Sequence, residues 1–186
     1  MDGREAVVVC RLSHRPGRDD RMTTHVGLTA RALGADRVVL PDNATGPAGT
    51  VEGITGRFGG PFEVALRESP TAFVRDWSGT VAHLTMYGLP VQDVETELRA
   101  ANAAEPLLVV VGGEKVPFEV YERADYNVAV TNQPHSEVAG LAVLLDRLFD
   151  GAELDREWAD ADRVVVPKET GKKVVDPETE SGDAGE

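Results

Sequence analysis

Residues 127–142, NVAVTNQPHSEVAGLA, decide the fold when they are read with residues 108–117, LVVVGGEKVP, which precede them. Each stretch begins with an apolar run typical of a β-strand and then changes abruptly to small or polar residues. The later stretch continues into residues with helical spacing, for which Ser136 is a suitable N-cap. Because ligands of α/β proteins bind where strands end and helices begin, the two loops predict one shared pocket.

The same alternation extends along the whole chain. Short runs rich in valine, isoleucine and leucine predict strands at residues 6–12, 37–40, 62–66, 81–85, 107–111 and 127–130. Segments with helical spacing are found at residues 24–33, 51–58, 71–77, 91–101, 118–124 and 136–149. The strand runs are continuous rather than alternating, which is typical of strands covered on both faces. The pattern therefore predicts an α/β fold with a mostly parallel sheet flanked by helices.

The length and composition bound the domain organisation. A chain of 186 residues suits one domain. We expect it to span residues 1–175, with a short extension from about residue 150 that includes an extra strand at 163–167. Residues 176–186, DPETESGDAGE, are acidic and almost free of apolar residues, which predicts a disordered tail.

The single cysteine, Cys10, excludes an intrachain disulfide and a cysteine-based zinc site. No run of residues is long and apolar enough for a membrane span, and the N-terminus lacks the apolar core of a signal peptide. We therefore expect a cytoplasmic protein with no membrane partner.

The charge balance is strongly acidic, with 32 aspartates and glutamates against 19 lysines and arginines and a formal net charge of −13. Taken alone, such acidity argues against a nucleic-acid partner, because phosphate binding needs local positive charge. Lysine is scarce, however, which favours adaptation to high salt, where acidic surfaces keep proteins soluble and charge repulsion is screened. Net charge therefore excludes no RNA partner, and the local distribution of charge must decide.

Residues 11–25, RLSHRPGRDDRMTTH, reverse the local charge and are called the arginine-rich loop below. One interpretation is a phosphate-contacting surface in which an arginine also polarises or helps to deprotonate a hydroxyl. The alternative is a solvated loop whose arginines pair with Asp19 and Asp20. The acidity of the rest of the chain favours the first interpretation.

Several known site motifs are absent from the sequence. The GGEKVP segment lacks the spacing of a phosphate-binding P-loop, and neither a dinucleotide fingerprint nor a nucleophile elbow occurs. His135 has no partner at a zinc-binding spacing, so we expect no metal. Gly112 and Gly113 either form a simple turn or let the backbone approach a flat ligand closely. The NQPHSE segment is a helix entry that could also hold an adenine-like ligand with its backbone.

Four segments together resemble a known family, the archaeal tRNA (cytidine-56) 2′-O-methyltransferases of the SPOUT superfamily. They are RLSHRPGRDDRMTTHVGLTARALGAD, HLTMYGLPVQDV, VVVGGEKVPFEVYERADYNVAVTNQPHSEVAGLAVLLDRL and the late GKKV, and the resemblance runs from about residue 7 to residue 175. It implies a SPOUT-type domain with a C-terminal trefoil knot, S-adenosylmethionine as cofactor, tRNA as partner and a homodimer with each site near the interface. The middle loop departs from the family pattern, because it reads Gly-Gly-Glu where Gly-Ala-Glu is expected.

The resemblance also implies which residues form the site. By position, the cofactor-binding residues are Leu84, Tyr87, Gly88, Gly112, Gly113, Glu114, Lys115, Val116, Val130, Thr131, Asn132, Gln133, Pro134, His135, Ser136 and Glu137. Related ribose methyltransferases use an arginine near the first loop, which makes Arg21, then Arg18 and Arg11, the catalytic candidates. Two alternatives stay open: a SPOUT methyltransferase with another RNA target, and a non-catalytic module that binds RNA or nucleotides.

Overall fold

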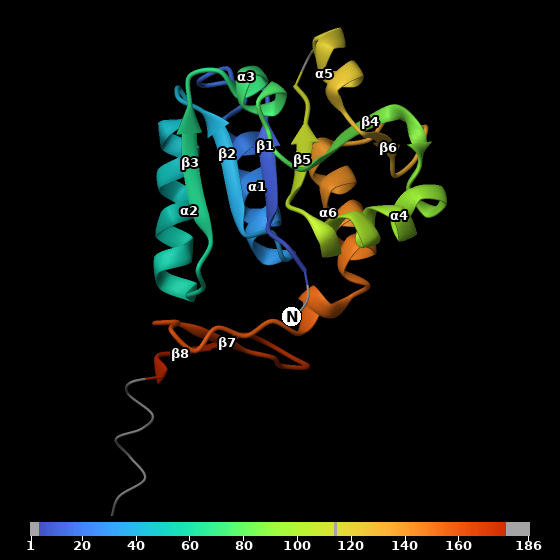
Figure 1. Ribbon diagram of the computed structural model, residues 1–186. Helices are drawn as coiled ribbons and strands as arrows, with labels where there is room; N and C mark the ends of the chain where they lie inside the picture. Colours follow the sequence, from blue (N-terminus) through green and yellow to red (C-terminus); the bar gives the residue numbers. More distant parts are fainter. Residues whose placement is uncertain (1–3, 114, 178–186) are drawn as a thin grey trace, which may run out of the picture.

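Parallel strands form the central sheet of the computed structural model, which describes residues 4–113 and 115–177 (Figure 1). The strand order is β3-β2-β1-β5-β4-β6, and every pairing in this sheet is parallel. The strands are β1 (Val7–Arg11), β2 (Arg37–Pro41), β3 (Glu63–Arg67), β4 (Thr80–Pro90), β5 (Leu107–Val111) and β6 (Tyr126–Ala129). The predicted α/β architecture with a parallel sheet is confirmed.

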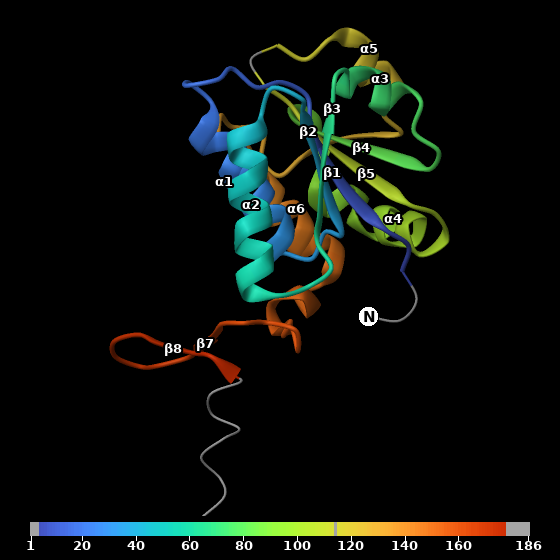
Figure 2. The same cartoon turned by 90° about the vertical axis from the view of Figure 1, so that its left-hand side faces the viewer.

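Helices cover both faces of this sheet (Figure 2). They are α1 (Asp20–Ala32), α2 (Thr45–Phe58), α3 (Pro70–Arg75), α4 (Val91–Ala104), α5 (Phe118–Arg123) and α6 (Glu137–Phe149). Side chains of α1, α2, α4 and α6 share the larger core with Val7 and Val9 of β1. Side chains of α3 and α5 share the smaller core with Val8 and Cys10. Because adjacent residues of one strand enter opposite cores, the strand sequences are continuously apolar, as predicted.

Two helices begin earlier than the spacing of apolar residues predicts. Helix α1 begins at Asp20 rather than at residue 24, and α2 begins at Thr45 rather than at residue 51. The first turns of α2 contain glycine and proline, which are poor helix formers, so local propensity does not predict a helix there. Tertiary packing compensates for this low helix propensity, since Pro47 and Ala48 in those turns are buried.

Strand β4 differs from the prediction because it does not end at residue 85. It continues to Pro90, and both Leu84 and Leu89 pair with Val128 of β6. The residues between these two positions, 85–88, therefore leave the ladder as a bulge and the strand then resumes. The sequence Thr-Met-Tyr-Gly suggested a strand end, whereas the pairing with β6 restores the strand beyond it.

The C-terminal segment turns back from the sheet edge toward the centre of the domain. Strand β6 lies at the edge beside β4, but the following helix α6 packs against α1 and α4. On the way, the Asn132 amide donates hydrogen bonds to the carbonyl oxygens of Met86 and Gly88 in the β4 bulge, at 2.7 and 3.1 Å. This course is consistent with the trefoil knot that the resemblance implies, and the knot itself stays a prediction.

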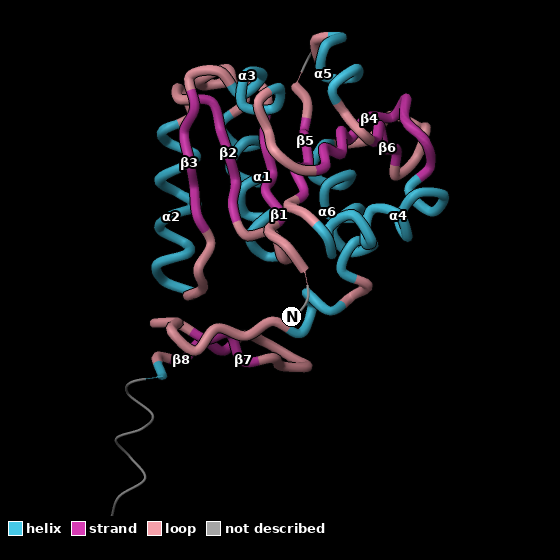
Figure 3. The backbone as a smooth tube through the Cα atoms, viewed as in Figure 1, coloured by secondary structure: helices cyan, strands magenta, loops and turns pink. Residues whose placement is uncertain are grey.

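The extension after α6 forms a small separate hairpin (Figures 1 and 3). A 3-10 turn, η1 (Ala152–Asp155), is followed by the antiparallel strands β7 (Val164–Val166) and β8 (Lys173–Val175). The extra strand at 163–167 was expected, but its partner β8 was not, because GKKVV has only two apolar residues. The division into a domain at 1–175 and a tail at 176–186 stays a prediction, and residues 178–186 lie outside the described part.

Candidate functional site

A cavity of about 320 Å³ lies beside the bulge of β4 and the carboxyl ends of β5 and β6. It is lined by His83, Leu84, Thr85, Met86, Tyr87, Val111, Gly112, Gly113, Val116, Tyr121, Pro134, His135, Glu137 and Gly140. A larger, more open hollow of about 780 Å³ lies beside Arg4, Asp36 and Trp158. Two of its lining residues, Ala6 and Asp36, directly precede β1 and β2, so this hollow is at the opposite end of the sheet. Since ligands of parallel α/β sheets bind at the carboxyl ends of the strands, the smaller cavity is the candidate site.

Half of the predicted cofactor-binding residues line this cavity. They are Leu84, Tyr87, Gly112, Gly113, Val116, Pro134, His135 and Glu137. The others that the structure describes lie in the same loops without lining it: Gly88, Lys115, Val130, Thr131, Asn132, Gln133 and Ser136. The prediction for Glu114 falls on a residue outside the described part. The shared pocket formed by the two loops is thus present, with the β4 bulge as its third wall.

The sequence analysis did not assign six of the lining residues to the site. His83, Thr85 and Met86 lie in the HLTMYG segment that carries the resemblance, from which only Leu84, Tyr87 and Gly88 were named as site residues. Val111 is the last residue of β5. Tyr121 and Gly140 are each the fourth residue of a helix that follows a cavity loop, α5 and α6. One turn into a helix, a side chain points back over the preceding loop, and this spacing could have indicated Tyr121. Gly140 has no side chain, and a Cβ there would lie 2.9 Å from Nε2 of His135.

The glycine pair allows a close approach between parts of the protein itself. A Cβ at Gly113 would lie 1.9 Å from Oγ of Ser13, and one at Gly112 would lie 2.7 Å from Val116. Ser13 belongs to the arginine-rich loop. The pair therefore brings the loop after β5 against the loop after β1, whatever ligand it also accommodates.

Polar contacts hold the loop between β6 and α6 in place. Ser136 is the N-cap of α6, as predicted, because its Oγ accepts from the Ala139 backbone N–H at 3.1 Å. Nδ1 of His135 lies 2.8 Å from the Gln133 carbonyl oxygen, and Asn132 ties the loop to the β4 bulge. Asn132, Gln133 and Ser136, which were predicted to bind the cofactor, thus fix the conformation of this loop without lining the cavity.

His83 lines the cavity and carries a buried hydrogen-bond acceptor. Its side chain is buried, and Nδ1 lies 2.9 Å from Oδ1 of Asn127. The Asn127 amide donates to the Tyr121 carbonyl oxygen, which fixes the orientation of the amide, so Nδ1 of His83 must carry the proton. Nε2 is then an acceptor, and it is buried without a hydrogen-bond partner among the described residues.

Burial lowers the pKa of His83, because it disfavours the charged ring more than the hydrogen bond to Asn127 favours it. The unfolded chain therefore binds a proton at this residue below about pH 6.5 while the folded chain resists it. We expect the free energy of unfolding to decrease as the pH falls through this range, and to decrease less in His83→Gln. Thermal unfolding of both proteins between pH 7.5 and 5.5 in constant salt measures the difference, and parallel curves would contradict the prediction.

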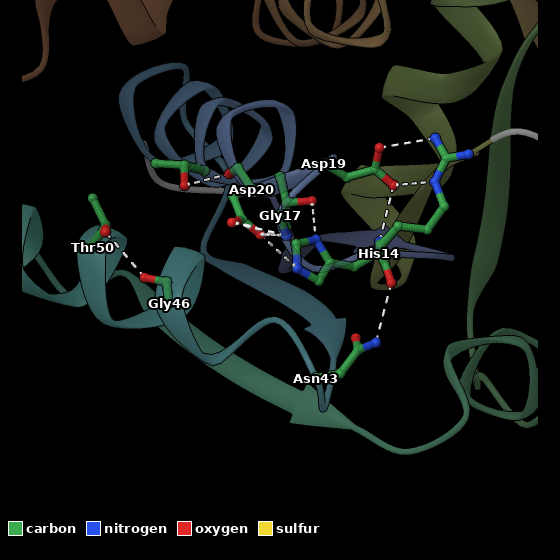
Figure 4. A network of polar contacts seen from close by, with 10 residues as sticks. His14, Gly17, Asp19, Asp20, Asn43, Gly46 and Thr50 are labelled. Atoms are coloured by element: carbon green, nitrogen blue, oxygen red, sulfur yellow. Dashed lines mark hydrogen bonds and ion pairs between the residues drawn. The ribbon is translucent and has the colours of Figure 1, made fainter.

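The arginine-rich loop is partly neutralised by its own acidic residues (Figure 4). Arg15 forms a bidentate ion pair with Asp19, and its hydrogen bonds lower the pKa of Asp19 to about 2. His14 is buried; its Nδ1 lies 2.9 Å from Oγ1 of Thr23 and its Nε2 lies 3.2 Å from Asp20. The alternative of an internally paired loop is therefore correct for Arg15.

The three candidate catalytic arginines lie in different environments. Arg11 is buried at the end of β1 and forms an ion pair with Glu137, which lines the cavity. Arg18 and Arg21 are exposed, and neither lines the cavity in a single chain. The structure thus places Arg11 beside the site and leaves Arg18 and Arg21 on the surface.

Solved structures with this architecture include methyltransferases that modify RNA. The SpoU methyltransferase AviRb from Streptomyces viridochromogenes, solved with the cofactor AdoMet, matches with a TM-score of 0.52 at 14% identity, over 81% of this chain and 59% of that one. The TrmH/SpoU tRNA-modifying enzyme of A. aeolicus matches with a TM-score of 0.50 at 14% identity, over 82% of this chain and 77% of that one. The fold is that of the SPOUT-type methyltransferases.

Sequence comparison then gives the family. The model of the family described as tRNA ribose 2′-O-methyltransferase, aTrm56, matches residues 58–175. A tRNA (cytidine(56)-2′-O)-methyltransferase of Haloarcula marismortui is 72% identical over 94% of this chain and 97% of its own length. One of Thermococcus kodakarensis is 51% identical over 92% of this chain and 98% of its own. This chain belongs to the aTrm56 family of tRNA ribose 2′-O-methyltransferases, and its haloarchaeal relatives fit the interpretation of its acidity as adaptation to salt.

Proposed function

We propose that this protein transfers a methyl group from S-adenosylmethionine to the ribose 2′-hydroxyl of cytidine 56 in the TΨC loop of tRNA. The observation that carries the proposal is the near full-length identity of 72% to a relative that bears this activity in its name. The cavity at the strand ends supports it, because it lies at the place where parallel α/β sheets bind nucleotide-like ligands.

The residues of the cavity fit this cofactor. Leu84, Met86 and Val116 offer apolar surface, while the unpartnered Nε2 of His83 can accept a hydrogen bond from an amino or hydroxyl group. When bound, S-adenosylmethionine supplies a methyl group attached to a positively charged sulfur. The exposed loop at 131–136 leaves the cavity open to the solvent side, from which a ribose can approach.

The chemistry requires alignment of the hydroxyl with the methyl group and removal of the hydroxyl proton. Glu137 lines the cavity but is engaged by Arg11. We assign the activation of the hydroxyl to an arginine, first Arg21 and then Arg18, with Arg11 as a positioning residue. This assignment requires a homodimer in which the exposed arginines of one copy face the cavity of the other.

The proposed setting is a cytoplasmic homodimer that binds tRNA. Within residues 4–113 and 115–177, no helix combines the length and apolarity needed to cross a membrane. A methyltransferase with another RNA target, or a module that binds RNA without turnover, remains as the alternative for testing.

Nucleoside mass spectrometry tests the function directly. Unmodified tRNA transcript is incubated with the protein and S-adenosylmethionine in molar potassium chloride, and nuclease fragments locate any 2′-O-methylcytidine. One mark at cytidine 56, lost when that nucleotide is changed to adenosine, is the expected result. Cofactor binding without methylation would favour another target, and no cofactor binding would contradict the methyltransferase assignment.

Arg21→Ala is expected to lower kcat by about 100-fold or more, because a cation that stabilises developing negative charge is lost. Affinities for tRNA and S-adenosylmethionine should change much less. Arg57→Ala, an exposed arginine on α2, is the matched control. If Arg21→Ala binds both ligands and keeps full turnover, Arg21 has no catalytic role.

A further inference from the structure

Two aromatic rings, one in the cavity wall and one stacked on a residue of that wall, are exposed to solvent. The side chains of Tyr87 and Phe118 are 75% and 73% exposed, more than any other large hydrophobic side chain in the described part of the chain. Tyr87 lines the cavity. Exposed aromatic surface is unfavourable in water, so two such rings beside one cavity indicate a contact surface.

The backbone that carries Tyr87 is held firmly. Asn132 donates hydrogen bonds to the carbonyl oxygens of Met86 and Gly88, on either side of Tyr87. The Tyr87 backbone N–H lies 3.4 Å from Oγ1 of Thr85. The bulge of β4 therefore presents its ring from a fixed position, which lowers the entropy cost of binding a partner.

Phe118 is connected to the same cavity wall through Tyr121. The rings of Phe118 and Tyr121 are stacked, with centroids 6.4 Å apart and an interplanar angle of 23°. Tyr121 lines the cavity, and its hydroxyl lies 3.4 Å from Oγ1 of Thr85. Thr85 thus contacts both Tyr121, on which Phe118 stacks, and the backbone of Tyr87, so the two exposed rings are connected through the cavity wall. In Figure 1 the start of α5 and the bulge of β4 lie toward the same end of the molecule.

We propose that Tyr87 and Phe118 form an aromatic rim that stacks on unpaired nucleobases of the RNA substrate beside the methyl-transfer cavity. The proposal rests on the proposed function, because it places the substrate at this cavity. Proteins bind unpaired bases of RNA by stacking them on aromatic side chains.

The charge of the protein favours stacking over phosphate contacts. The net charge is −13, and at molar salt the screening length falls to about 3 Å. Contacts between cations and phosphates are then weak, whereas stacking does not depend on charge. An enzyme of this composition therefore gains from an aromatic contact at the point where its substrate must be positioned.

The test measures binding of tRNA and of S-adenosylmethionine separately, in molar potassium chloride, for Tyr87→Ala and Phe118→Ala. Each change should weaken tRNA binding about 5- to 100-fold. Phe118→Ala should leave the Kd for S-adenosylmethionine within twofold, and Tyr87→Ala should weaken tRNA binding more than cofactor binding. Tyr87→Phe and Phe118→Trp should keep tRNA affinity near that of the unchanged protein. Leu154→Ala, at a similarly exposed apolar residue in η1, is the control and should have no effect.

Three results would overturn the proposal. Equal losses of cofactor and tRNA affinity would place the rings against the cofactor instead. A concentration-dependent loss of the dimer in sedimentation would place them between two copies of the chain. Unchanged tRNA binding would remove the rim from recognition. Because tRNA binding is measured without turnover, a failure of the rim is distinguishable from absence of methylation at cytidine 56 in the unchanged protein.

Discussion

Gly88→Ala is expected to reduce methylation of tRNA by at least about 100-fold, because displacing a site by 1 Å can cost this much. A Cβ at residue 88 would lie 2.3 Å from the Asn127 carbonyl oxygen and 2.5 Å from the Val128 backbone nitrogen. These are backbone atoms of β6, so no side-chain rotation relieves the clash. The bulge of β4 must move away from β6, and it carries Met86 and Tyr87 of the cavity wall with it.

The Gly88→Ala change should also weaken cofactor binding and lower stability, which can be measured without turnover. Binding of S-adenosylmethionine, measured by calorimetry, should weaken strongly, and the melting temperature should fall, since overpacking costs about 1–3 kcal/mol. Gly49→Ala is the control, because a Cβ there meets no atom within 4 Å and alanine is the better helix former in α2. A Gly88→Ala protein with normal cofactor affinity would show that the bulge does not form the cavity.

Glu137→Gln is expected to lower the free energy of unfolding by about 3–5 kcal/mol, the usual consequence of leaving a buried charge without its partner. The side chain of Arg11 is only 3% exposed, whereas that of Glu137 is 31% exposed. Nη1 of Arg11 donates to Oε2 of Glu137, and Nε of Arg11 has no hydrogen-bond partner among the described residues. The carboxylate is therefore the main group that compensates the buried positive charge. At roughly 2–4 °C per kcal/mol for a domain of this size, the melting temperature should fall by about 6–20 °C.

A double-mutant cycle separates the ion pair from other roles of Glu137. Arg11→Met combined with Glu137→Gln should recover most of the lost stability, because no unpaired charge remains in the core. Glu122→Gln, an exposed carboxylate on α5, is the control and should change the free energy of unfolding by less than about 0.5 kcal/mol. A fall of less than 2 °C in Glu137→Gln would show that the pair contributes little.

The sequence by itself determined the layered fold and the location of the site. Continuous apolar runs such as Leu107–Val111 predicted strands covered on both faces, and the structure buries every residue of that run. The abrupt change from apolar to small or polar residues after β5 and β6, with Ser136 as a helix N-cap, predicted a pocket at the strand ends. These features are local in the chain, since strand period, capping and loop composition act over a few residues.

Only the tertiary structure decided which residues meet at the site. The bulge of β4 depends on the pairing of both Leu84 and Leu89 with Val128, far along the chain. The orientation of His83 depends on Asn127, and the role of Arg11 depends on Glu137, which is 126 residues away. Arg11, Arg18 and Arg21 are near one another in sequence, yet one is buried in an ion pair and two are exposed. A residue's neighbours in the sequence determine its local conformation, but its burial and its polar partners come from segments that only folding brings together.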